Sequence, residues 1–113
     1  MATLSEGFHD GEFLLSEANG NRSREVVTLT GGPYVAGQVL GKITASGKYT
    51  EYDNGASDGT QAAAAILYAA ADGSAADVQA TVIIRDAEIS SSALTGSDAN
   101  GVTDLLALGI IVR

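Results

Sequence analysis

A chain of 113 residues with fourteen acidic and six basic side chains has a formal net charge of −8 and is expected to form one domain. This charge argues against binding to nucleic acid, whose phosphates it would repel, and the absence of cysteine excludes disulfides and thiol chemistry. No apolar run approaches the roughly 20 residues of a membrane helix, and no secretory signal is recognisable, so we expect synthesis and use in the cytoplasm.

The composition predicts a thin hydrophobic core. Hydrophobic residues make up 45% of the chain, but aromatic residues are only 5% and tryptophan is absent, so much of the apolar content is alanine. A chain of this length buries about 65% of its unfolded surface when it folds alone. Because oligomerisation is a common way for a small domain to gain buried area, the scarcity of large side chains favours an oligomer.

The first 20 residues differ from the rest of the chain. They carry four acidic and no basic side chains, and three glycines interrupt any long helical or strand pattern. They also contain five large apolar side chains, which are unusual in a purely solvated tail: Leu4, Phe8, Phe13, Leu14 and Leu15. Two interpretations follow, an extension that packs on its own domain or an arm that binds a partner.

The pattern from Arg24 onward is typical of short β-strands. Residues 25–30 are rich in β-branched side chains, and Gly31-Gly32-Pro33 is expected to end that strand. Further strands are expected at residues 34–36, 38–43 and 48–52, and residues 53–60 have loop composition throughout.

The second half of the chain is also expected to be mainly β. Residues 77–85 form the clearest strand, followed by short strands at 87–89 and 110–112. A short helix over 105–108 is expected, capped by Thr103-Asp104 and ended by Gly109. Residues 61–71 fit either a helix, by alanine propensity, or a buried strand. Because no βαβ alternation occurs, we predict a single, mainly β domain with one or two short helices.

Catalytic, cofactor and metal residues are not indicated by any pattern. His9 is the only histidine, which excludes zinc sites that need several histidine or cysteine ligands. Residues 53–59 and 96–101 contain oxygen ligands among glycines but fail the calcium-loop pattern, so turn chemistry explains them. No phosphate-binding glycine motif or nucleophile elbow occurs, and Asp86 and Glu88 are interpreted as a solvated pair that shares one strand face.

Three segments resemble, in order and spacing, the head decoration proteins of lambda-like tailed phages. The longest is VAGQVLGKITASGKYTEYDNGASDGTQAAAAILYAAA, residues 35–71. It is accompanied by GEFLLSEANGNRSREVVTL, residues 11–29, and by the closing LLALGIIVR, residues 105–113. Together they cover most of the chain. The resemblance also favours the strand over the helix within residues 61–71, at 64–68, and implies a fold similar to a β-clip.

The resemblance implies a structural protein of the virion and no enzyme. It implies a homotrimer on the outer surface of the expanded phage capsid, at threefold and quasi-threefold sites, where it binds the major capsid protein and stabilises the head against DNA pressure. It also divides the chain into an N-terminal capsid-binding arm, residues 1–20, with Leu4, Phe8, Phe13, Leu14 and Leu15 as its contacts, and a β-rich decoration domain, residues 21–113. Synthesis in the bacterial host cytoplasm is implied.

Two other functions remain as alternatives at this point. The first is a small trimeric enzyme of the nucleotide-hydrolase type on a β-clip scaffold, because one fold can host many functions. It would need phosphate recognition, for which the sequence supplies no motif. The second is a glycan-binding adhesion module on the virion, for which four tyrosines and no tryptophan give thin support.

Overall fold

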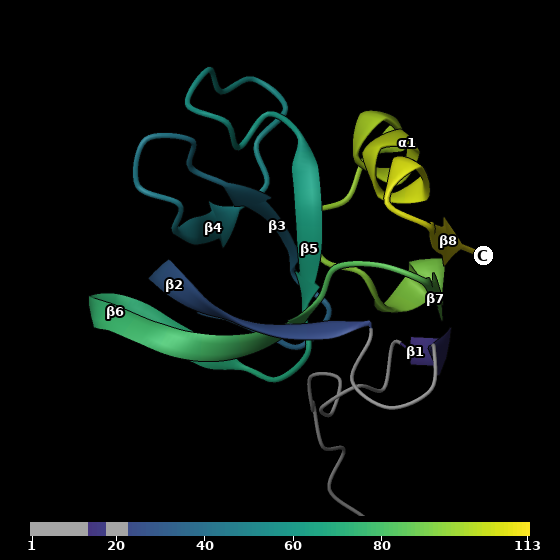
Figure 1. The fold of residues 1–113 in the computed structure, drawn as a ribbon, viewed down its shortest axis with the longest axis horizontal. Coiled ribbons are helices and arrows are strands. Elements are labelled where there is room, and N and C mark those ends of the chain that lie inside the picture. The colour runs from purple at the N-terminus through teal and green to yellow at the C-terminus, as the bar shows by residue number, and fades with distance from the viewer. Residues whose placement is uncertain (1–13, 18–22) are drawn as a thin grey trace, which may run out of the picture.

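The computed structural model describes residues 14–17 and 23–113, which form eight strands, one 3₁₀ turn and one α-helix (Figure 1). In chain order the elements are β1 (Leu14–Glu17), β2 (Arg24–Tyr34), β3 (Val39–Lys42), β4 (Tyr49–Glu51), β5 (Ala63–Leu67), β6 (Ala71–Ile83), β7 (Ala87–Ile89), η1 (Ser91–Ala93), α1 (Ala99–Ala107) and β8 (Ile110–Val112). The predicted fold class, a small and mainly β domain, is confirmed.

Five strands close into a barrel in the order β2-β4-β3-β5-β6. The longest pairing joins β2 to β6 in antiparallel register, from Arg24 opposite Ile83 to Tyr34 opposite Ala71. Because successive residues of a strand point to opposite faces, alternate side chains turn into the barrel and fill it. These buried residues, the barrel core, are Leu29, Leu40, Ala65, Leu67, Ala80 and Val82.

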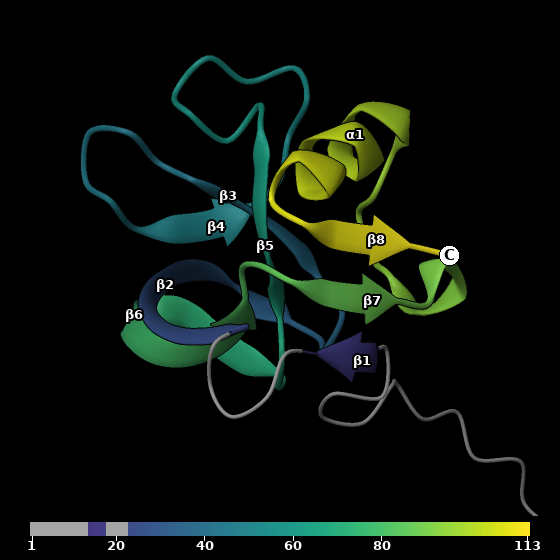
Figure 2. The same ribbon diagram turned by 45° about the vertical axis from the view of Figure 1, so that its right-hand side comes forward.

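A second sheet, in the order β1-β7-β8, lies beside the barrel (Figure 2). β1 is antiparallel to β7 and β8 is parallel to it, so Leu14, Ile89 and Val112 lie in register at the end where the C-terminus emerges. The helix α1 packs against β5 and β8. A second buried cluster, the inter-sheet core, joins these parts: Val39, Tyr52, Ala63, Ile66, Ile83, Ala87, Ile89, Ala93, Leu105 and Ile110.

The prediction that Gly31-Gly32-Pro33 ends a strand is wrong, because β2 continues through these residues to Tyr34. Both glycines have positive φ, at 82° and 117°, and the register to β6 shifts on either side of Gly31. The glycines thus form an irregularity inside a long strand, and a backbone without a Cβ tolerates such a bend. Residues 35–36, also expected in a strand, lie in the connection to β3.

In the second half of the chain one strand prediction is confirmed, and another began too late. The alanine-rich segment forms the strand β5, as predicted over the helical alternative, because it is buried between β3 and β6. The strand β6 begins at Ala71 rather than 77, because its first residues pair with the far end of β2. Tertiary pairing decided both outcomes.

The predicted helix start at Thr103-Asp104 is also wrong. α1 begins at Ala99, six residues before the predicted first helical residue, and its N-cap is Asp98, whose carboxylate accepts a 2.7 Å hydrogen bond from the Gly101 N–H. This bond satisfies a backbone donor that the first turn leaves unpaired. Gly109, at φ 83°, follows the last turn as predicted.

Candidate functional site

The five predicted arm residues divide between two parts of the chain. Leu4, Phe8 and Phe13 lie outside the described residues. Leu14 is half-buried and packs against the inter-sheet core, whereas Leu15 is 55% exposed. Because both belong to β1, which pairs with β7, residues 14–17 of the predicted arm form a strand of the domain.

A bidentate ion pair fastens β1 to the barrel. Arg24 Nη2 donates to Glu17 Oε1 at 2.6 Å and Arg24 Nε donates to Glu17 Oε2 at 3.0 Å. The same guanidinium lies over the Tyr68 ring, 4.3 Å from its centroid. The hydrogen bond to Glu17 raises the pKa of Arg24 further above its usual value. Among side chains, only the planar guanidinium of arginine can bind a carboxylate through two hydrogen bonds and stack on a ring at the same time. We call this contact between Arg24 and Glu17 the clasp, and it fixes β1 to the barrel.

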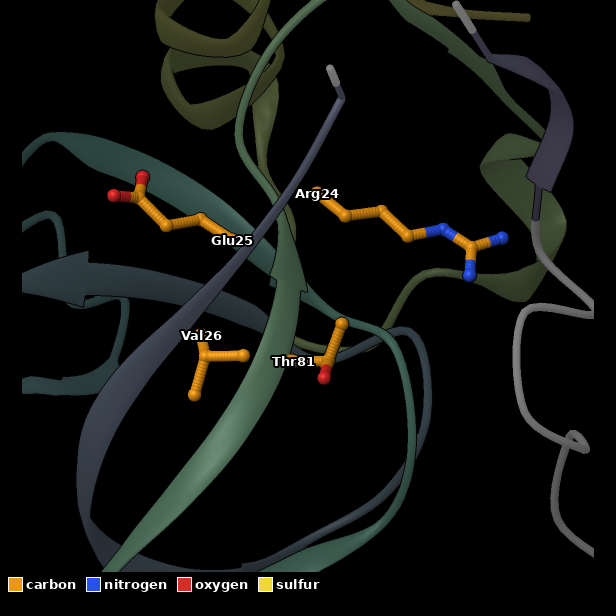
Figure 3. A pocket seen from close by; sticks show the side chains of 4 residues that line it. All are labelled: Arg24, Glu25, Val26 and Thr81. Atoms are coloured by element: carbon orange, nitrogen blue, oxygen red, sulfur yellow. The ribbon is translucent and has the colours of Figure 1, made fainter. Parts of the chain in front are cut away.

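A cavity of about 350 Å³ lies next to the clasp, at β2 and β6, and is lined by Arg24, Glu25, Val26 and Thr81. The side chains of Arg24 and Glu25 point away from β2 in opposite directions, one on each side of the strand (Figure 3). Val26, opposite Thr81 in register, is 62% exposed. Arg24 is held by Glu17, and Glu25 lies 3.6 Å from Arg85. The cavity therefore offers an apolar side chain between paired charges, which suits a contact surface.

Three exposed apolar side chains follow one another closely in the sequence, where α1 ends and β8 begins: Leu106, Leu108 and Ile111. The Gly109 N–H donates to the Leu106 carbonyl at 3.0 Å, so the chain folds back at the helix end and brings β8 beside the last turn. From Gly109, Ile111 is two residues along a strand, roughly 7 Å. We call these residues the C-terminal apolar surface. Residues 105–112 contain no charged side chain in a strongly acidic chain.

The acidic loops stabilise local turns. In the loop of residues 53–60, Asp53 accepts from the Gly55 N–H at 3.0 Å, and Asp58 accepts from the Thr60 N–H and hydroxyl at 3.1 and 2.6 Å. These hydrogen bonds, that from the hydroxyl first, lower the pKa of Asp58. The turn interpretation of this loop agrees with these bonds. The segment 96–101 instead contains the N-cap and first turn of α1.

The predicted pair of Asp86 and Glu88 does not share a strand face. Asp86 lies between β6 and β7 with φ at 49°, and Glu88, on β7, binds Arg113 Nε at 2.5 Å. No group of three potential metal ligands gathers within the described residues, and His9 lies outside them. No helix of the described part is long and apolar enough to cross a membrane.

Sequence reasoning missed two of these arrangements. Asp98 is a favourable N-cap residue and could have indicated the helix start. The prediction placed the start later because Asn100-Gly101, shortly after it, has the composition of a turn. The Arg24–Glu17 clasp had no sequence signal, because the two residues belong to different sheets and only the tertiary fold brings them together.

The described residues form a small, mainly β domain whose notable features are exposed apolar side chains, an internal ion pair and a capped helix. The chain matches the family model of the bacteriophage lambda head decoration protein D over residues 3–110, nearly its whole length, and it belongs to this family. No curated protein matches the chain. This match confirms the resemblance. Because the family consists of structural proteins of the capsid, the chain is a head component that decorates the phage capsid.

Proposed function

We propose that this protein binds as a homotrimer to the outer surface of the expanded phage capsid, at threefold and quasi-threefold sites. There it contacts the major capsid protein and stabilises the head against the pressure of packaged DNA. Family membership over residues 3–110 is the observation that carries this proposal. Synthesis in the bacterial host cytoplasm precedes attachment to the virion.

The C-terminal apolar surface is proposed as the contact between subunits. Copies of a chain with net charge −8 repel one another, so self-association favours a surface without charge. Leu106, the most exposed of the three side chains at 60%, projects from the solvent-facing side of α1, since the helix buries Gly101 and Leu105. Covering such side chains adds the buried area that a thin alanine-rich core lacks.

The N-terminal arm is proposed as the contact with the major capsid protein. Leu4, Phe8 and Phe13 precede β1, and the clasp between Arg24 and Glu17 holds β1 in the domain. An extended segment that adds to a strand of the coat protein would satisfy the backbone groups of both chains. In a trimer, docking of one arm raises the effective concentration of the other two at neighbouring sites.

Reconstitution on capsids tests this function. Expanded capsids that lack the protein are incubated with the purified full chain and imaged by electron microscopy, with unexpanded capsids as the control. We expect added density of three subunits on the outer surface at threefold and quasi-threefold positions of expanded capsids alone. Absence of density, or density elsewhere on the lattice, would contradict the proposal.

A further inference from the structure

The dipeptide Asn54-Gly55 occupies an exposed turn between β4 and β5. The Ala56 N–H donates to the Asp53 carbonyl at 3.0 Å, which closes the turn with Asn54 and Gly55 at its centre. Among the described residues, a Cβ added at Gly55 would meet only Asp53 Oδ1, at 3.5 Å. The space around the Gly55 backbone is therefore open.

Two features of this turn favour a reaction between neighbouring residues. Gly55 has no side chain to obstruct the approach of its backbone nitrogen to the Asn54 side-chain amide. The Gly55 N–H also donates to Asp53 Oδ1 at 3.0 Å, so a carboxylate lies within reach of the proton that the nitrogen must lose. A nucleophile, an electrophile and a base are thus contiguous in three residues.

We propose that Asn54 is a site of spontaneous deamidation. The Gly55 nitrogen bonds to Asn54 Cγ and passes its proton to the Asp53 carboxylate. The Cγ–Nδ2 bond then breaks, and the amide group takes up a proton and leaves as ammonia. The resulting succinimide is opened by one water molecule to aspartate or isoaspartate, so the balance is water consumed and ammonia released.

The dipeptide Asn100-Gly101 provides an internal comparison. The Gly101 N–H also donates to a carboxylate, Asp98 Oδ1 at 2.7 Å, but both residues belong to α1. Ring closure requires rotation of the Asn100 backbone, which would break the first turn, where the Val102 N–H donates to the Asp98 carbonyl at 3.0 Å. The helix therefore protects Asn100, whereas the turn leaves Asn54 free to react.

Deamidation adds one negative charge beside Asp53, in a loop that projects from the opposite side of the molecule to β1 (Figures 1 and 2). The modified protein is more acidic but keeps the strand that carries the arm. This inference is independent of the proposed function, since it concerns the chemistry of one turn.

Peptide mass spectrometry of the native full chain, kept in warm, mildly alkaline buffer made with heavy-oxygen water, tests the proposal. We expect the Asn54 peptide to gain about one dalton, plus the oxygen label, well before the Asn100 peptide does, and the two rates to converge in denaturant. The third such pair, Asn19-Gly20, lies outside the described residues and is followed in its own peptide. Equal rates at Asn54 and Asn100 in the native protein would overturn the proposal.

Two variants test the parts of the mechanism. Gly55→Ala is tolerated because Gly55 is outside the left-handed region and its neighbourhood is open, and we expect the rate at Asn54 to fall about tenfold, a barrier increase of about 1.4 kcal/mol. Asp53→Asn keeps an oxygen acceptor but removes the base, so it should also slow the reaction. An unchanged deamidation rate in Asp53→Asn would show that Asp53 is not the base. An unchanged rate in Gly55→Ala would overturn the proposed attack by the Gly55 nitrogen.

Discussion

The Tyr52 hydroxyl donates a 2.8 Å hydrogen bond to Asp98 Oδ1, the same carboxylate oxygen that caps α1. Tyr52 is buried in the inter-sheet core directly after β4, so this bond ties the start of the helix to the barrel. A second carboxylate of α1, Asp104, accepts from the Ala63 N–H of β5 at 3.0 Å. Two acidic side chains thus fix the position of the helix that carries Leu106.

Removal of the Tyr52 hydroxyl should destabilise the protein modestly. Tyr52→Phe keeps the ring in the core but loses one hydrogen bond, and we expect the free energy of unfolding in urea to fall by about 1 kcal/mol. Asp98→Ala should lose more, because the Gly101 N–H loses its cap as well. Tyr49→Phe is the control, since the Tyr49 hydroxyl has no hydrogen-bond partner among the described residues. An equal effect of the two tyrosine variants would contradict this account.

The same contact predicts how stability depends on pH. The Gly101 N–H and then the Tyr52 hydroxyl lower the pKa of Asp98 below 3.8, so its contribution is present above that pH and is lost as the pH falls through the folded value. Burial, followed by the bond to Asp98, raises the pKa of Tyr52 from 10.0 to about 12, so its contribution is complete below pH 10 and is lost between 10 and 12. We expect urea unfolding, measured across both pH ranges, to show two effects. Tyr52→Phe should reduce the loss of unfolding free energy at alkaline pH, and Asp98→Asn should reduce the loss at acid pH.

The clasp between Arg24 and Glu17 should show measurable coupling. A double-mutant cycle of Arg24→Ala and Glu17→Ala is expected to give a coupling free energy of about 1 kcal/mol, the upper end for a partly exposed pair, because the contact is bidentate. Arg24→Lys should lose most of it, since an ammonium cannot fork or stack on Tyr68. The 3.6 Å pair of Arg85 and Glu25 is the control, with expected coupling near zero. Equal coupling in both cycles would contradict a special role for the clasp.

The proposed subunit contact is tested by charge placed on the C-terminal apolar surface. Leu106→Asp should convert the proposed trimer to monomers in analytical ultracentrifugation, and the monomers should keep the fold, because the side chain is 60% exposed on the single domain. Val26→Asp, at a side chain of β2 that is 62% exposed, is the matched control and should leave the proposed trimer intact. The opposite result would place the contact at the β2–β6 cavity.

The arm is tested by a deletion that stops before β1. Removal of residues 1–13 should preserve the fold and the trimer, because Leu14 and its contact with the inter-sheet core remain, but abolish attachment to expanded capsids. Phe13→Ala should weaken attachment more than Glu6→Ala, since burial of one large apolar side chain is worth roughly 1.5–3 kcal/mol in each proposed arm. If the truncated protein decorates capsids as tightly as the full chain, the binding surface lies on the body of the domain.

Much of the fold was predictable from the sequence because strand periodicity and turn residues are local signals. The strands around residues 25–30, 77–83 and 110–112 follow from β-branched and alternating side chains, and Gly109 marks the helix end. The family was recognisable for a related reason, since the order and spacing of three segments are properties of the chain alone.

The tertiary structure decided what local signals could not. The alanine-rich segment became β5 because two neighbouring strands bury it, against its own helix propensity. Leu14 and Leu15, similar neighbours in the sequence, separated into a core contact and an exposed side chain because β1 pairs with β7. Arg24 met Glu17, and Tyr52 met Asp98, because each contact joins segments that only the packed fold brings within hydrogen-bond distance.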